Sequence, residues 1–158
     1  MAAALFVSAG PGRAAEPACP LGNHNGRIAE LLQFVFFDWN DVTIGPEAVA
    51  ILDNVATVSS QVPQCPIWLG GHADTSGPRP YNLALSGRRA EAVVAWLRQH
   101  GVRAEIHVMG WGETRPLVET GDDVREPRNR RVEIAMAWDS APPRGVAVME
   151  PAPSSPLR

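Results

Sequence analysis

The sequence predicts an α+β fold in which a mixed four-stranded sheet has helices packed on one face, in the order β-α-β-α-β-β. Stretches with apolar residues at every second position, as in strands, lie between stretches with apolar residues at helical spacing. The two strand-helix-strand units imply right-handed crossovers within one sheet. The last strand follows a loop rather than a helix, so we expect a mixed sheet and a two-layer sandwich.

The composition fits one compact domain with additional tails. The chain has 158 residues, of which 45% are hydrophobic and 20% are charged, which is enough for a substantial core. A net charge of −3 and a pI of about 5.8 give no basic surface, so nucleic acid is not expected as a partner. No apolar run approaches the roughly 18 residues needed to cross a bilayer, and no membrane-spanning helix is expected.

Four segments are expected along the chain. Residues 1–15 hold a short apolar run followed by small residues and are interpreted as a truncated signal peptide, which indicates export. Residues 16–32 are expected to form a linker that ends in a short helix over 23–32. The folded domain is predicted at 33–138, and the Pro-rich residues 139–158 are expected to be disordered.

The first two elements of the domain have clear local signals. Residues 33–38, QFVFFD, are aromatic and β-branched and end in a polar turn, as is typical of a strand. Pro46 is suited to the first turn of a helix that we expect to reach about Gln61. Apolar residues occupy one face of that helix.

The chain continues with a strand, a second helix, another strand, a long polar loop and a final strand. The expected ranges are 66–72 for the second strand, 81–101 for the second helix, 104–112 for the third strand, 113–129 for the loop and 130–138 for the fourth strand. Gly101 is suited to end the second helix. In the fourth strand Val132, Ile134 and Met136 alternate with charged or small residues, as expected for a sheet with one apolar face.

A polar stripe interrupts the apolar side of the second helix. At 100° per residue, Arg89 projects into that side, one turn after Leu85 and one turn before Val93. Asn82 lies on the same line as Arg89, with Ser86 close by. These polar groups therefore face the sheet.

Further charges are expected at the same place. Asp74 follows the carboxyl end of the second strand directly, where open sheets place ligands. Period two puts Arg130 on the helix-facing side of the fourth strand. Asp38 has the parity of Phe34 and Phe36, so if those aromatic side chains face the helices, Asp38 faces them too, at the end of the strand.

Two interpretations of these charges remain open. They can form a structural salt-bridge network, such as Asp74 with Arg89, because buried charges are costly unless they are paired. Alternatively, they can form a small pocket in which arginines bind a carboxylate, aspartates bind an ammonium group and Asn82 supplies an amide. Such a pocket suits an amino-acid head group.

Four segments also resemble a known family. The segments are FDWNDVTIGPEA, GHADTSGPRPYNLALSGRRAEAV, GWGETRP and NRRVEI, and in this order they are similar to the OmpA C-terminal-like domain over residues 33–138. Two positions, Ala73 and Trp39, depart from the usual residues of that family, and neither removes a matched contact.

The resemblance implies a function and a set of site residues. Members bind the peptide stems of the bacterial cell wall non-covalently through diaminopimelate, without a cofactor or a metal. Asp74 and Arg89 match the central contacts; Asp38, Asn82 and Arg130 match supporting contacts, and Thr75 matches a backbone amide contact. The resemblance implies a periplasmic protein at the cell wall or outer membrane of a Gram-negative bacterium.

Two alternative functions fit the same residues less well. The first is a domain of the same fold whose charged pocket is internally paired and whose partner is another envelope protein. The second is a wall-cleaving glycosidase using Asp38 and Asp74, or Glu113, but neighbouring arginines would keep the aspartates ionised and poor as acids. We therefore do not expect an enzyme. His72 and Asp74 have no apparent third metal ligand.

Cys19 and Cys65 are the two cysteines of the chain. In an exported protein an even number favours a disulfide, which could contribute about 4 kcal/mol on the chain-entropy model. Two buried thiols are the alternative, and the spacing fits no zinc site.

Overall fold

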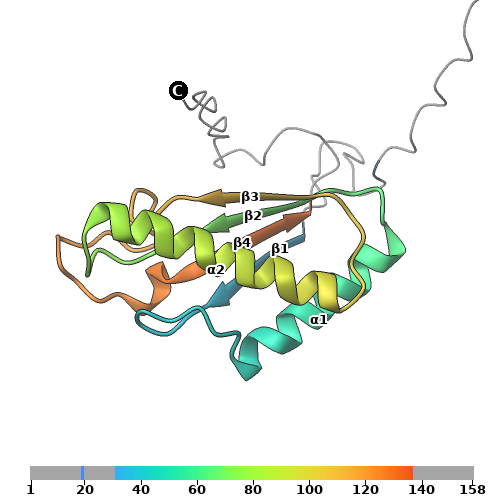
Figure 1. Cartoon of the computed structure of the whole chain (residues 1–158), viewed down its shortest axis with the longest axis horizontal. Helices are drawn as coiled ribbons and strands as arrows, with labels where there is room; N and C mark the ends of the chain where they lie inside the picture. The colour runs from blue at the N-terminus through green and yellow to red at the C-terminus, as the bar shows by residue number, and fades with distance from the viewer. Residues whose placement is uncertain (1–18, 20–30, 137–158) are drawn as a thin grey trace, which may run out of the picture.

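The computed structural model of the chain describes Cys19 and residues 31–136. The predictions for residues 1–15 and 139–158, and most of the prediction for 16–32, therefore lie outside the described residues. The fold has the predicted elements in the predicted order, plus a short 3-10 turn (Figure 1). Their bounds are β1 Leu31–Phe36, α1 Pro46–Gln61, β2 Ile67–Gly71, α2 Arg79–Gln99, β3 Ile106–Gly110, η1 Pro127–Asn129 and β4 Arg131–Met136.

The sheet is mixed, as expected, with the strand order β1-β4-β2-β3. The last strand, β4, lies between β1 and β2 and is antiparallel to both, while β2 and β3 are parallel. The carboxyl ends of β1, β2 and β3 therefore share one edge of the sheet with the amino end of β4. This edge collects the loops that follow three strands and the residues that precede the fourth.

Both helices pack on the same face of the sheet. The main core joins the inward residues of α1 and α2 to alternate residues of the strands, including Val35, Leu69 and Ile134. The polar stripe of α2 is buried in this layer, and Asn82, Ser86 and Arg89 are each at most 3% exposed.

The phase of β1 differs from the expectation. Val35 and Phe37 are buried in the helix-facing core, whereas Phe36 is 48% exposed and stacks with Phe34 on the other side. The condition under which the Asp38 side chain would face the helices, that Phe34 and Phe36 face them, is therefore not met. The apolar run around them has no polar alternation to set its phase. The strand also begins at Leu31, within the range expected to be the end of a helix.

Glycines let α2 approach the sheet closely. A Cβ atom added to Gly71 would lie 2.0 Å from the carbonyl oxygen of Ser86, and one added to Gly110 would lie 3.1 Å from the Ser86 hydroxyl. Only glycine fits such a backbone contact. The first half of α2 is thereby brought down onto the edge where β2 and β3 end.

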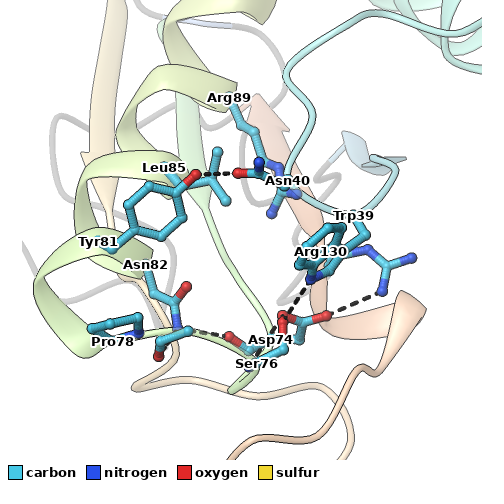
Figure 2. A pocket seen from close by; sticks show the side chains of 11 residues that line it. Trp39, Asn40, Asp74, Ser76, Pro78, Tyr81, Asn82, Leu85, Arg89 and Arg130 are labelled. Atoms are coloured by element: carbon cyan, nitrogen blue, oxygen red, sulfur yellow. Dashed lines mark hydrogen bonds and ion pairs between the residues drawn. The ribbon is translucent and has the colours of Figure 1, made fainter.

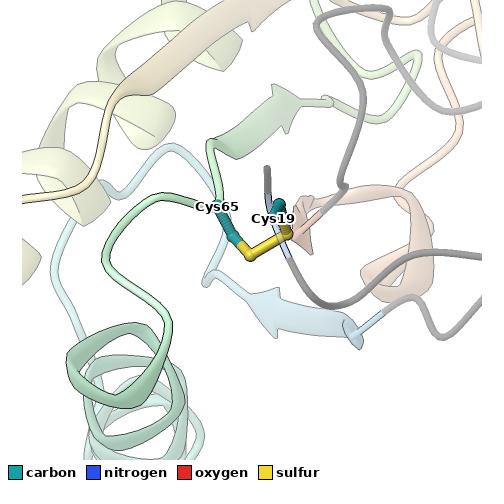
Figure 3. Close-up of a disulfide and its surroundings, with 2 residues drawn as sticks. All are labelled: Cys19 and Cys65. Carbon is teal, nitrogen blue, oxygen red and sulfur yellow. A yellow bond between two sulfur atoms is a disulfide. The ribbon is translucent and has the colours of Figure 1, made fainter. Parts of the chain in front are cut away.

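A disulfide joins Cys19 to Cys65, as predicted (Figure 3). Cys65 is fully buried and lies just before β2, at the edge of the sheet opposite the shared carboxyl ends. Among the described residues, no helix is long and apolar enough to cross a membrane.

Candidate functional site

A cavity of about 340 Å³ lies at the shared edge of the sheet, between the start of α2 and the loops after β1 and β2 (Figure 2). Four of the six residues predicted for a ligand site line it: Asp74, Asn82, Arg89 and Arg130. Its remaining lining residues are Trp39, Asn40, Ser76, Gly77, Pro78, Tyr81 and Leu85. The volume suits a small ligand or one end of a larger one.

Arg89 lines the cavity and is 0% exposed. Its guanidinium donates to three backbone carbonyls: Nε to Asp41 at 2.9 Å, Nη1 to His72 at 3.1 Å and Nη2 to Asp38 at 2.9 Å. These carbonyls belong to the loops after β1 and β2, so Arg89 ties α2 to the ends of both strands.

No carboxylate within the described part of the chain forms an ion pair with Arg89. Burial lowers the pKa of its guanidinium to about 10, with nearby Asp74 acting in the opposite direction. The group is still a cation at neutral pH. An arginine has five N–H donors, and the three carbonyl contacts leave one on each terminal nitrogen for a ligand.

The acidic group of the cavity is Asp74, which is 4% exposed. Its Oδ2 accepts a hydrogen bond from Arg130 Nη1 at 3.1 Å, and its Oδ1 accepts one from the Ser76 hydroxyl at 2.6 Å. Arg130 Nε also donates to the carbonyl of Phe37 at 3.0 Å. The salt bridge in this site therefore joins Asp74 to Arg130, and not to Arg89 as the structural interpretation suggested.

Asn82 connects the cavity to the neighbouring loops. Its side-chain nitrogen lies 3.0 Å from the carbonyl of Asp74, 2.9 Å from that of Gly77 and 2.6 Å from Glu113 Oε2. Glu113 also forms an ion pair of 3.0 Å with the exposed Arg79. Asn82 thus fixes the loop that carries Asp74, and it holds Glu113 beside the site.

Asp38 and Thr75, the other two predicted residues, do not line the cavity. The side chain of Asp38 is exposed and lies at a separate hollow beside Pro46, so only its carbonyl takes part, through Arg89. The Thr75 hydroxyl donates to the carbonyl of Gly121 at 2.7 Å and so ties down the long loop before β4.

Two aromatic side chains that were not predicted as site residues, Trp39 and Tyr81, lie at the rim of the cavity. Trp39 is 48% exposed and its indole N–H donates to the Ser76 hydroxyl at 3.0 Å. Tyr81 is 42% exposed and its hydroxyl donates to the Asn40 side chain. Their positions beside Asp38 and Asn82 in the chain were a signal that could have identified them.

The donor set suits an organic ligand more than a metal. Within residues 31–136 no group of three or more His, Cys, Asp or Glu side chains could hold a metal ion. Two arginines, one aspartate and one amide can bind a carboxylate and an ammonium group together.

Comparisons with known proteins identify relatives of this chain. The chain is 41% identical over 109 residues to an outer membrane protein of Gluconacetobacter diazotrophicus, covering 65% of this chain and 29% of that protein. It is 31% identical over 137 residues to a peptidoglycan-associated lipoprotein of Pseudomonas putida, covering 80% of this chain and 82% of that protein.

Solved structures give the same result. The crystal structure of the peptidoglycan-associated lipoprotein from Burkholderia pseudomallei matches with a TM-score of 0.62 and 30% identity, covering 74% of this chain and 98% of that one. The OmpA family model matches residues 36–130, a range that includes every element lining the cavity. This chain therefore belongs to the OmpA family.

Proposed function

We propose that this domain binds bacterial peptidoglycan non-covalently, through the free amino-acid end of diaminopimelate in the stem peptide, and anchors its protein to the cell wall. The observation that carries the proposal is Arg89. It is a fully buried cation that lines a cavity and has no carboxylate partner among the described residues. A ligand carboxylate would supply the missing partner.

The other charges fit the rest of the head group. Arg130 and Ser76 donate to different oxygens of the Asp74 carboxylate. Asp74 can attract an ammonium group while it accepts both hydrogen bonds. Thr75 follows Asp74 and could contribute its backbone amide, and Asp38 acts through the carbonyl that positions Arg89. Diaminopimelate carries an amine and a carboxylate on one carbon, as this arrangement requires.

The relatives support the same function. The proteins matched in Pseudomonas putida and Burkholderia pseudomallei are described as peptidoglycan-associated. The chain spans 29% of the outer membrane protein from Gluconacetobacter diazotrophicus, so the proposal concerns this domain and not the remaining part of such a larger protein. We place the domain in the periplasm of a Gram-negative bacterium, at the wall or outer membrane.

The alternative is an interaction domain for another envelope protein with an internally paired pocket. The Asp74–Arg130 ion pair of 3.1 Å is the feature that favours it. Arg89 argues against it, because a fully paired network would include that residue.

The test is sedimentation of the purified protein with sacculi of two kinds, one with diaminopimelate in the stem and one with lysine. Lysine has the amine without the distal carboxylate, so we expect binding to the first kind only. Asp74→Asn should weaken binding by about thirtyfold, which corresponds to about 2 kcal/mol for a lost buried charge partner. Glu133→Gln, outside the cavity, is the matched control and should bind like the wild type.

Equal binding to both kinds of wall would exclude recognition of the distal carboxylate. Absence of binding to either kind, together with a folded protein, would favour the protein-interaction alternative. Release of soluble muropeptides during the incubation would instead show an enzyme.

A further inference from the structure

The mouth of the cavity is closed into a ring by side-chain contacts (Figure 2). The Tyr81 hydroxyl donates to the Asn40 side chain. Trp39, which directly precedes Asn40, donates its indole N–H to the Ser76 hydroxyl at 3.0 Å. Ser76 donates to Asp74 at 2.6 Å. The ring returns to α2 through Asn82, which donates to the carbonyl of Asp74 at 3.0 Å and is the neighbour of Tyr81.

Two aromatic side chains form opposite sides of this ring. Figure 2 shows Trp39 and Tyr81 across the cavity from each other, one from the loop after β1 and the other from α2. Each is more than 40% exposed, yet each is held by a hydrogen bond. The guanidinium of Arg125 also covers the indole of Trp39, at 3.8 Å. Both rings are therefore fixed before a ligand arrives.

The ring of contacts at the mouth lies close to the charged residues of the cavity. Trp39 is separated from the Asp74 carboxylate by only the Ser76 hydroxyl, through contacts of 3.0 Å and 2.6 Å. If Asp74 binds the ammonium of a head group, the carbon atoms behind that head group would extend toward the mouth of the cavity, which Trp39 and Tyr81 line from two sides. Leu85 and Pro78 add further apolar wall at this level.

We propose that Trp39 and Tyr81 form a rigid aromatic collar that selects ligands by the chain behind the head group, accepting an unbranched methylene chain and rejecting a branched one. This inference rests on the proposed function, because it takes an amino-acid head group to be bound at Asp74 and Arg89. A methylene chain packs between two flat rings, and burying each methylene strengthens binding about fourfold. A methyl branch next to the head group would have to displace a ring that is held in place.

The test compares norleucine with isoleucine, which have the same atoms and head group but differ in branching. Each is titrated, as both enantiomers, into isotopically labelled wild-type protein while amide and indole NMR signals are followed. Meso-diaminopimelate is titrated in parallel as the probe of the proposed function. We expect the wild type to bind diaminopimelate and to prefer norleucine to isoleucine by at least tenfold.

Variants separate the aromatic wall from its hydrogen bonds. Trp39→Ala removes the aromatic ring and its hydrogen bond, and it should abolish the preference for norleucine over isoleucine. Trp39→Phe and Tyr81→Phe keep an aromatic ring but lose the hydrogen bond, and each should reduce this preference by at least threefold. Trp96→Phe is the matched control, since Trp96 lies near the other end of α2, about 22 Å from Tyr81 along the helix axis. It should leave the preference unchanged.

The possible results distinguish the two proposals. If the wild type does not bind diaminopimelate, the proposed function fails and the collar fails with it. If it binds diaminopimelate but does not distinguish norleucine from isoleucine, or if Trp39→Ala keeps the preference, the collar is wrong and the proposed function stands. Because Trp39 is 48% exposed, its variants should fold, and matching NMR spectra away from the site check this.

Discussion

Arg130 and Arg131 are neighbours in the chain, but their side chains lie in different charged clusters. Arg130 lines the cavity on the helix-facing side and pairs with Asp74 at 3.1 Å. Arg131 points to the opposite face of the sheet, where it pairs with Glu133 at 2.5 Å and lies near the buried His72. The two arginines are 8% and 3% exposed, so burial alone does not distinguish the clusters.

The difference lies in what the surrounding charges leave unpaired. In the cluster on the opposite face, Arg131 forms an ion pair with Glu133, so this buried arginine has a carboxylate partner. The cavity has two arginines for one aspartate, and within residues 31–136 the hydrogen bonds that Arg89 donates all go to backbone carbonyls. A buried arginine that borders a cavity and has no carboxylate partner among the described residues is the feature on which the proposed binding site rests.

The largest effect should come from comparing Arg89→Ala with Arg131→Ala. Arg89→Ala leaves three carbonyls without their donor, so we expect the free energy of unfolding to fall by about 3–5 kcal/mol and wall binding to disappear. Arg131→Ala should also destabilise the fold, but it should leave wall binding within twofold. Urea unfolding and sacculus sedimentation, at a temperature where both variants are folded, measure the two quantities.

We thus expect a substitution on the face of Arg131 to lower stability alone, and a substitution at Arg89 to lower both stability and wall binding. If folded Arg89→Ala protein still binds the wall, or if Arg131→Ala abolishes binding, the distinction between the clusters is wrong. Should Arg89→Ala be too unstable to purify, Arg89→Lys retains the charge but not the forked geometry, and we expect it to lose binding as well.

The cluster on the opposite face should show a pH effect of its own. Burial, with Arg131 nearby, lowers the pKa of His72 from 6.5 to about 3. The unfolded chain therefore binds a proton below pH 6.5 while the folded chain does not, and stability falls as the pH falls. Between pH 6.5 and pH 5 the loss should be about 2 kcal/mol, with full stability above pH 6.5.

His72→Gln removes this titration, so its free energy of unfolding should vary less over the same range. Chemical denaturation at several pH values measures both proteins. Parallel pH profiles would show that His72 does not have the depressed pKa. The carboxylates of Asp41 and Glu126, whose pKa values are lowered by hydrogen bonds from Thr43 and Arg128, act only at lower pH.

The smallest effect is expected at Arg88, the neighbour of Arg89. Arg88 is exposed and its guanidinium lies 5.7 Å from the centre of the Tyr81 ring. An exposed cation–π contact is worth about 0.5 kcal/mol, so Arg88→Ala should weaken wall binding by no more than about two- to threefold. A tenfold loss by the same sedimentation assay would mean that charge outside the cavity contributes to recognition.

The sequence was sufficient for the order of the elements and for the edge where the site forms. Turn residues and capping residues mark the ends of the helices locally, and Asp74, Asn82, Arg89 and Arg130 reach the cavity from positions that strand and helix periodicity indicate. These are local properties, so they can be inferred from a single chain.

The pairing of the charges could not be inferred in the same way. The partners of Arg89 are carbonyl groups, which every residue has, and their positions depend on the shape of the loop after β1. In that loop the Asp41 carboxylate accepts hydrogen bonds from Thr43, and Asn40 has a φ of 53°. The side chain of Asp38 was predicted to point to the site on the assumption that Phe36 faces the helices, and that assumption was wrong.

The disulfide gives the proposed tether a direction for mechanical load. Cys65 precedes β2 and the cavity follows it, so this strand connects the covalent link to Cys19 with the loop that carries Asp74. Tension between the wall and the chain at Cys19 would run along β2, which is hydrogen-bonded to β3 and β4 on its two sides. Arg89 shares that tension with the end of β1 and with α2. A central strand of the sheet, β2, would bear the force instead of a surface loop.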